Sequence, residues 1–322
     1  MSDAGRPLTL LRTAAGSPPT VTQYRAFREL GCRIVAADSD PRSVGFAFAD
    51  AAHVVPRVGA PDFLDHMVDL CRRERVDLFL PALDEELVLC ARHRERFREA
   101  GTRILVSSTA ALEICTDKLA TYQAFLDLGI PTPPTVASEA WREGAVPGWP
   151  LVVKPRRGRG GQGVHLAADP EEAAFLVRRA AGAVVQAHCP GEELTLDVLA
   201  DQDGELRILS PRRRLAVESG ISSKGETCWR EDLVEPVRRI VGGLGLAGPL
   251  NIQCFVGERV LFTEVNARIA GTAILTQAAG VPFFQGILAL ARGGRPEPWL
   301  KPAPRVAMLR YWEEAFSPGE GA

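Results

Sequence analysis

Residues 251–268 have the sequence NIQCFVGERVLFTEVNAR, in which two apolar runs flank a Gly-Glu-Arg turn. These runs predict two neighbouring strands, over residues 250–256 and 260–265. Side chains two positions apart on a strand point to the same side, so we expect Glu264 and Asn266 to project together into one site.

The polar residues of these strands suit a metal ion that is bound together with phosphate. Gln253 comes from the first strand, and Glu264 and Asn266 come from the second. One carboxylate and two amides, with room left for phosphate and water, are oxygen ligands of the kind that Mg²⁺ takes. Arg268, two positions farther on, can bind phosphate or carboxylate with its planar guanidinium. The alternative is that Glu264 and Arg268 only form a surface ion pair.

A second cluster, LVVKPRRGRGGQGV at residues 151–164, places Lys154 at the end of a predicted strand and follows it with a glycine-rich hairpin. The glycines let backbone N–H groups approach a polyphosphate, and the ammonium offsets its charge. The hairpin formally contains GxGxxG, but that motif should open a helix in a dinucleotide-binding turn, and a strand is expected here instead. The sequence has no GxxxxGK[ST], which excludes a P-loop.

Before residue 110 the predicted elements alternate, with strands over residues 8–13, 32–37, 76–81 and 103–106 and helices over residues 20–30, 61–75 and 84–100. This alternation indicates parallel βαβ units in a doubly wound domain. Ligands of such sheets bind at the carboxyl ends of the strands, where Asp38 and the run Asp84-Glu85-Glu86 are expected to lie. The alternative for Asp84 is that it only caps the following helix.

After residue 115 the pattern changes. A helix is predicted over residues 116–128, with Thr116 as its cap. Hairpin-like strands are then predicted over residues 151–154, 163–166, 183–186 and 194–200, and a last strand over residues 306–311. Further helices are predicted over residues 170–181, 234–244, 272–279 and 282–291.

The composition restricts the class of protein. The chain has 322 residues, 46% hydrophobic and 24% charged, which is typical of a globular protein. It has no apolar run of bilayer length and no signal-peptide layout, so we expect a cytoplasmic protein without a membrane partner. A net charge of −2 gives no reason to expect nucleic acid. Seven scattered cysteines without a CxxC pair favour buried thiols.

Taken in order, the motifs resemble the ATP-grasp superfamily, and most closely its carbamoyl-phosphate-synthase-like and biotin-carboxylase-like branch. The ordered set is Thr116-Asp117-Lys118, Lys154-Pro155 with its glycine loop, Gln186 with Pro190-Gly191-Glu192-Glu193, Gln253, and Glu264-Val265-Asn266-Ala267-Arg268. The resemblance covers residues 8 to 292. It implies mixed α/β and α+β architecture, with an N-terminal doubly wound parallel α/β domain (1–115) and a two-lobed ATP-grasp domain (116–300, lid lobe about 120–185). A C-terminal strand and tail (301–322) would follow.

The resemblance also implies a role for each matching residue. Lys118 and Lys154 would contact ATP phosphates, under a lid that contains Gly160 and Gly161. Gln186 would meet the adenine amino group, where the family more often has Glu, and the backbone at His188 would face the adenine ring. Glu193 would bind the ribose hydroxyls. Gln253, Glu264 and Asn266 would form the magnesium set, with Mn²⁺ as a substitute, and Arg268 would steady the transferring phosphoryl group.

The implied reaction is phosphorylation of a small carboxylate by ATP, followed by attack of an amine on the acyl phosphate. Residues 220–225 would form a loop near the acyl phosphate, and their sequence without histidine departs from carbamoyl-phosphate synthase. Two alternatives stay open. One is a bicarbonate-using carboxylase or carbamoyl-phosphate-type enzyme, and the other is a non-catalytic ATP-binding protein. A homodimer is also left open.

Overall fold

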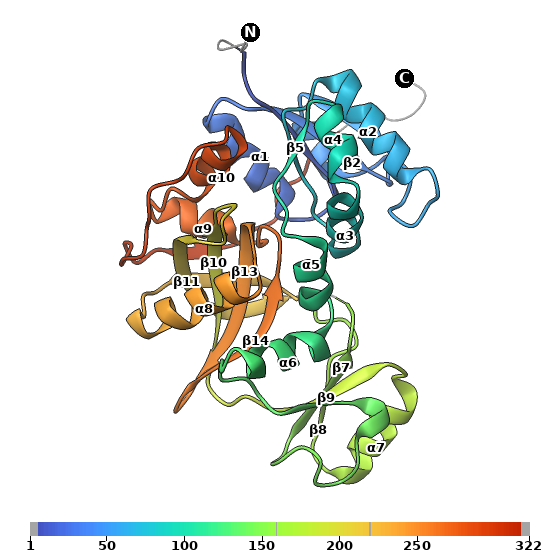
Figure 1. Cartoon of the computed structure of the whole chain (residues 1–322), viewed down its shortest axis with the longest axis vertical. Coiled ribbons are helices and arrows are strands. Elements are labelled where there is room, and N and C mark those ends of the chain that lie inside the picture. The colour runs from blue at the N-terminus through green and yellow to red at the C-terminus, as the bar shows by residue number, and fades with distance from the viewer. Residues whose placement is uncertain (1–5, 159, 219, 317–322) are drawn as a thin grey trace.

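The protein, seen in a computed structural model, is described over residues 6–158, 160–218 and 220–316. Its N-terminal part is built on a five-stranded sheet with the order β3-β2-β1-β4-β5, in which every pairing is parallel (Figure 1). The strands are β1 (Thr9–Arg12), β2 (Arg33–Asp38), β3 (Ala51–Val54), β4 (Leu78–Leu80) and β5 (Arg103–Ile104). A parallel sheet with β1 in its middle confirms the predicted doubly wound domain.

Helices cover both faces of this sheet because successive side chains of each strand point to opposite sides. Leu10 packs on the side of α1 (Thr20–Glu29) and α10 (Phe283–Ala291), and Leu11 packs on the side of α2 (Phe63–Glu74). The rings of Phe27 and Phe284 meet edge to face at 4.9 Å. A helix from the far end of the chain therefore completes the N-terminal core (Figure 1).

Some local predictions for this domain were wrong. The single helix predicted over residues 84–100 is two helices, α3 (Asp84–Arg92) and α4 (Arg94–Glu99). A further helix, α5 (Thr109–Cys115), and strand β3 were not predicted. Thr116 does not cap the next helix, α6 (Lys118–Asp127); that cap is Asp117, whose carboxylate accepts from the backbone N–H groups of the first helical turn.

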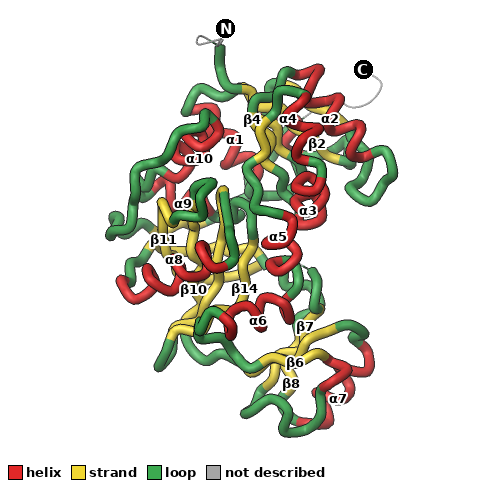
Figure 2. The backbone as a smooth tube through the Cα atoms, in the orientation of Figure 1, coloured by secondary structure: helices red, strands yellow, loops and turns green. Residues whose placement is uncertain are grey.

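The second part of the chain contains two antiparallel sheets (Figure 2). The larger has the order β14-β13-β10-β11-β12-β15. Its strands are β10 (Glu192–Ala200), β11 (Leu206–Glu218), β12 (Ile221–Thr227), β13 (Gly248–Val256), β14 (Val260–Asn266) and β15 (Ala307–Leu309). The long β11–β12 hairpin was not predicted, and the segment 220–225, expected as a loop, is mostly strand β12.

One face of the larger sheet is apolar and packs on α6 and α8 (Val234–Gly243). The rings of Phe125 and Phe262 lie 6.4 Å apart in this layer. Part of the opposite, polar face is covered by α9 (Ala273–Ala278). That polar face holds the site described below.

The smaller sheet has the order β6-β9-β7-β8 and lies at the end of the molecule far from the parallel sheet (Figure 2). Its elements are β6 (Thr135–Ala137), β7 (Leu151–Pro155), β8 (His165–Ala167), β9 (Ala183–Ala187) and helix α7 (Pro170–Arg179). Short 3-10 helices occur at Val44–Phe48, Ser138–Ala140 and Glu231–Leu233. Within the described ranges, no helix has the length and apolar character needed to cross a bilayer.

Candidate active site

A cavity of about 710 Å³ lies where the three sheets meet. Its walls contain all eleven residues that the sequence predicted for nucleotide, metal or catalysis: Lys118, Lys154, Gly160, Gly161, Gln186, His188, Glu193, Gln253, Glu264, Asn266 and Arg268. The structure therefore brings the set together around one space. Their individual roles stay predictions.

The floor of the cavity is the polar face of β13 and β14. Strand register places Gln253 opposite Glu264 and Asn251 opposite Asn266. The amide of Asn266 donates to Asn251 Oδ1 at 3.3 Å. Asn251 was not predicted as a site residue, although its position two residues before Gln253 puts it on the same face.

One carboxylate surrounded by amide oxygens fits Mg²⁺, which prefers oxygen ligands and keeps positions for phosphate and water. In the described part of the chain, no group of three or more His, Cys, Asp or Glu side chains could hold a metal on its own. A cation at Glu264 would thus draw its remaining ligands from the amides, from nucleotide phosphates and from water.

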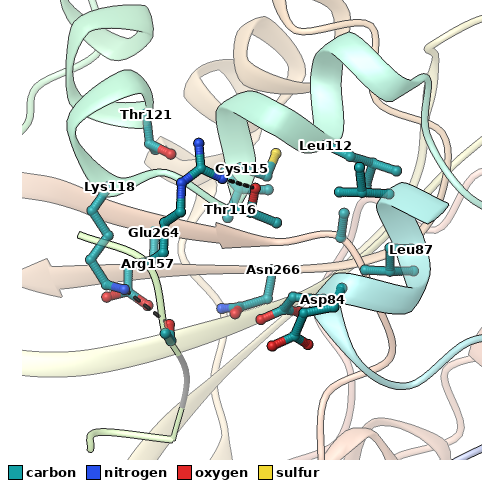
Figure 3. A pocket seen from close by; sticks show the side chains of 15 residues that line it. Asp84, Leu87, Leu112, Cys115, Thr116, Lys118, Thr121, Arg157, Glu264 and Asn266 are labelled. Carbon is teal, nitrogen blue, oxygen red and sulfur yellow. Dashed lines mark hydrogen bonds between the residues drawn. The ribbon is translucent and has the colours of Figure 1, made fainter. Parts of the chain in front are cut away.

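Two lysines flank this carboxylate. Lys154 is only 6% exposed, and its ammonium lies 3.3 Å from Glu264 Oε1. Lys118 begins α6 and donates to the Gly158 carbonyl oxygen at 3.0 Å (Figure 3). Burial lowers the pKa of the Lys118 ammonium, an effect that the nearby Glu264 charge opposes. Two cations beside a carboxylate that can hold a metal form an arrangement suited to polyphosphate.

The basic run after Lys154 has a structural role. Arg156 Nε donates to Asp117 Oδ1 at 2.7 Å, and Arg157 Nη2 donates to Asp117 Oδ2 at 3.1 Å. Although burial alone raises the pKa of Asp117, its hydrogen bonds from Arg156 and from the helix backbone hold it below its ordinary value. These contacts tie the start of α6, and hence Lys118, to the end of β7. Arg159, in the same run, lies outside the described residues.

The glycine loop closes over the cavity. Gly220 follows the β11 strand with φ of +76°, and a Cβ atom there would lie 2.2 Å from the carbonyl oxygen of Gly160. Only glycine allows this approach, since it has no Cβ and accepts positive φ. The tip of the predicted lid therefore rests directly on the β11–β12 hairpin.

Gln186, His188 and Glu193, the residues expected to meet adenine and ribose, line the same cavity. Gln186 donates through Nε2 to Thr135 Oγ1 at 2.7 Å, which leaves its side-chain oxygen as the acceptor for an amino group. His188 lies in the link between β9 and β10. Glu193 Oε1 is 2.5 Å from Arg214 Nη1, a pairing that the sequence did not predict. Arg214 also donates to the Gly220 carbonyl oxygen at 3.0 Å.

Arg268 joins the two parts of the chain. Its Nε donates to Asp84 Oδ1 at 2.8 Å, and both side chains are partly buried. The alternative that Asp84 only caps α3 is wrong, because Glu86 satisfies the start of that helix. The Glu86 carboxylate accepts from the backbone N–H groups of Ala82 and Leu83 and from the Thr13 hydroxyl.

The other acidic residues named from the sequence differ in position. Asp38 accepts from the Gly16 N–H at 2.8 Å. It lines neither the main cavity nor a smaller side cavity that adjoins it. A side cavity of about 300 Å³ shares Lys118, Gly158, Glu264 and Asn266 with the main one (Figure 3). Asp84 and Glu85 line it, together with apolar side chains of α3 and α5.

Several arginines of the cavity wall were not predicted as site residues. Arg212 is paired with Asp197 through two hydrogen bonds of 3.0 Å beneath α9, and Arg12 ends strand β1. The basic run 212–214 was noted in the sequence, and the alternation of a strand would have placed Arg212 and Arg214 on one face. No motif marks Arg12.

Models of two known domain families match the two parts of the chain. The chain matches the PylC-like N-terminal domain over residues 10–105 and the ATP-grasp domain over residues 115–272. Carbamoyl phosphate synthase large chains of Rubrobacter xylanophilus and Thermotoga neapolitana are 25% and 27% identical to it, over 78% and 80% of this chain. The chain spans about a quarter (25%) of the length of these curated relatives.

Solved structures of several enzymes share the fold. Biotin carboxylase from Campylobacter jejuni superposes with a TM-score of 0.71 at 17% identity, over 91% of this chain and 72% of its own. The L-amino acid ligase of Bacillus licheniformis superposes with a TM-score of 0.71 at 18% identity, over 89% of this chain and 74% of its own. N5-carboxyaminoimidazole synthetase of Staphylococcus aureus, complexed with ADP, superposes with a TM-score of 0.72 at 14% identity, over 91% of this chain and 79% of its own.

Proposed function

Because the chain belongs to the ATP-grasp superfamily, in the branch that includes carbamoyl phosphate synthase and biotin carboxylase, we propose that it is an ADP-forming carboxylate–amine ligase. ATP would phosphorylate a small-molecule carboxylate, and the acyl phosphate would be coupled to an amine. The observation that carries this proposal is the gathering of Lys118, Lys154, Glu264, Asn266 and Arg268 on one cavity.

The nucleotide would be held by residues of the two antiparallel sheets and of helix α6. Lys118 and Lys154 bind phosphate oxygens, while Gln186 and Glu193 receive the base and the ribose. Glu264, Asn266 and Gln253 would hold Mg²⁺, or Mn²⁺ in its place, with Asn251 beside them. The ion, when bound, offsets the negative charge of the phosphates. The loop with Gly160 and Gly161 keeps water away from the reacting groups.

The chemistry would proceed in two displacements. A carboxylate oxygen of the substrate attacks the γ-phosphorus, the bond to ADP breaks, and an acyl phosphate forms. Arg268 stabilises the charge on the moving phosphoryl group. The amine then attacks the carbonyl carbon, the carbon–oxygen bond to phosphate breaks, and the amine gives up a proton as the amide forms.

One observation favours a second candidate: the curated relatives are carbamoyl phosphate synthase large chains, and biotin carboxylase shares the fold. A bicarbonate-dependent carboxylase or carbamoyl-phosphate-type activity is therefore the alternative. It would require bicarbonate for ADP release, whereas the ligase requires an organic carboxylate. A cytoplasmic location and a homodimer stay predictions.

The test combines ADP release with trapping of the intermediate. The protein is incubated with Mg-ATP and a panel of amino acids and small carboxylates, with and without bicarbonate and hydroxylamine. We expect substrate-dependent ADP and a hydroxamate, both absent in Lys154→Ala, which should also bind Mg-ATP much more weakly. Release of AMP and pyrophosphate would mean adenylation and would refute the proposal. Binding of ATP without ADP release for any acceptor would favour the non-catalytic alternative.

A further inference from the structure

Arg12 is a buried cation that faces the cavity without a carboxylate partner. It is 4% exposed, yet it lines the wall that the N-terminal domain contributes. Its Nη1 donates to the Leu80 carbonyl oxygen at 3.1 Å and its Nη2 to Gln23 Oε1 at 2.6 Å. Its Nε is sealed from solvent and has no acceptor. Within the described residues, no acidic group forms an ion pair with it, and its two acceptors are both neutral.

A guanidinium has five N–H donors, and Arg12 uses two of them. Apart from the sealed Nε, each terminal nitrogen of Arg12 therefore keeps one N–H without an acceptor among the described residues. Buried charges are ordinarily paired, because removing them from water is unfavourable. Arg212, equally buried on the same cavity, follows this rule and is held by both oxygens of Asp197. Burial lowers the pKa of Arg12 to about 10, which still leaves the side chain charged at neutral pH.

The side chain of Arg12 is also held in place. Gln23, which accepts from it, donates in turn through Nε2 to the Ala270 carbonyl oxygen at 3.2 Å. Ala270 and Gln23 both line the cavity. A fixed, charged and incompletely bonded guanidinium is the kind of group that binds a carboxylate through two parallel hydrogen bonds.

Arg12 lies on a different element from the phosphoryl-transfer residues, although, besides burial, the nearby Arg268 charge contributes to lowering its pKa. Lys154, Glu264 and Asn266 lie on strands of the two antiparallel sheets, whereas Arg12 ends a strand of the parallel sheet. Its neighbours on the cavity wall, such as Ala14, Ser17 and Thr20, are small or neutral. These three side chains carry no charge, and none of them is a general base. The wall is suited to hold a part of the substrate that does not react.

We propose that Arg12 binds a carboxylate that the substrate keeps through the reaction, so that the substrate is an amino acid or a dicarboxylate. That the bound carboxylate belongs to a substrate rests on the proposed ligase function. The existence of a carboxylate-binding site rests on the geometry of Arg12 alone. Bicarbonate and simple monocarboxylates have no second carboxylate to place there. The retained carboxylate can belong to the carboxylate donor or to the amine acceptor.

The test measures binding rather than turnover. Mg²⁺ and a non-hydrolysable ATP analogue first fill the phosphate sites of the whole protein. Amino acids, succinate and glutarate are then titrated by calorimetry and thermal shift, each beside its monoamide or methyl ester. Arg12→Met is compared with Arg94→Met. Arg94 also binds only carbonyl oxygens, at 2.8–3.3 Å, but it lies in α4 and not on either cavity described above.

We expect at least one compound with two ionised groups to bind the wild type and Arg94→Met, while its amide or ester does not. Arg12→Met should weaken that binding on the order of ten- to a hundredfold, as for a lost charged hydrogen bond, with unchanged affinity for the ATP analogue. Arg12→Lys, which keeps the charge, should retain part of the affinity and serves if the methionine variant does not fold. The compound whose affinity depends on Arg12 is the one that carries the retained carboxylate.

Three results would overturn the inference: wild-type affinity in a folded Arg12→Met, equal binding of acid and amide, or no binding of any panel member to the wild type. Failure of the ligase proposal has a different signature. Acid-specific binding that depends on Arg12, without hydroxamate from any acceptor, would refute the ligase function and support the site.

Discussion

Replacing Arg268 by alanine should lower the turnover rate by a large factor and the free energy of unfolding by a small amount. The guanidinium donates to Asp84 at 2.8 Å, and the two side chains are 18% and 22% exposed. A hydrogen bond between charged groups contributes about 1.5–3 kcal/mol, and the access of water places this one toward the lower value. If Arg268 also stabilises the moving phosphoryl group, its loss adds about 2.7–4 kcal/mol to the barrier, or roughly a hundred- to a thousandfold in turnover.

Asp84→Asn is the matched control. It keeps the size of the side chain and an acceptor oxygen for Arg268, but it removes the charge of the pair. A purely structural role for Arg268 would make the two variants alike, with stability lost and turnover kept, because each removes the same ion pair. A catalytic role predicts that Asp84→Asn loses stability with turnover reduced less than about tenfold, while Arg268→Ala loses turnover with Mg-ATP affinity nearly unchanged.

Three measurements on each variant decide the matter: the melting temperature, the Kd for Mg-ATP by calorimetry, and substrate-dependent ADP release. A catalytic role for Arg268 is refuted if Arg268→Ala is destabilised but turns over normally. It is equally refuted if both variants lose turnover by the same factor. Arg268→Lys should recover only part of the rate, since an ammonium lacks the planar pair of donors.

Two further predictions concern the lid and the phosphate site. Burial lowers the pKa of Lys118 from its ordinary value of 10.5. Its protonated form, and hence Mg-ATP affinity, should therefore already decline below pH 10.5, and Lys118→Arg should remove the decline because arginine stays protonated. A wild-type affinity by calorimetry that is flat up to pH 10.5 would contradict this. Gly220→Ala would place a Cβ 2.2 Å from the Gly160 oxygen and should hold the lid open, which lowers the ratio of hydroxamate to ADP as water reaches the acyl phosphate. Gly204→Ala is its control, with φ of +78° but no atom nearer than 4.0 Å, and an equal ratio in both variants would disprove the lid contact.

The apolar runs predicted most strands because those strands bury one or both faces. The β11–β12 hairpin was missed because a polar stretch with Arg212-Arg213-Arg214 interrupts the apolar residues of its first strand. The charges are satisfied across strands instead: Arg212 by Asp197, Arg213 by Glu192 and Arg214 by Glu193. Those partners lie 15 to 21 positions earlier in the chain, so pairing them requires the sheet register.

The site residues that belong to a sequence motif could be predicted, and those outside any motif could not. Glu264 and Asn266 share a strand face, and local alternation is enough to place them together. Arg12 ends an apolar run, where a sequence alone does not show whether its side chain turns to solvent or into a cavity. The roles of Asp84 and Glu86 were likewise undecidable, because both sit in the first turn of one helix and only the packing against Thr13 and Arg268 separates them.

The segment after β14 explains why two domains are needed for one site. Asp84 accepts a hydrogen bond from Arg268, and Gln23 donates one to the Ala270 carbonyl oxygen. The N-terminal domain therefore contacts this segment at two positions that are two residues apart. Gln23 is also the residue that fixes Arg12. A carboxylate bound at Arg12 would therefore act on the same short segment that positions Arg268 beside the phosphates. Phe284 of α10 also packs on Phe27 of α1, so buried aromatic contact adds to the polar pairs in stabilising this connection between the two parts of the chain.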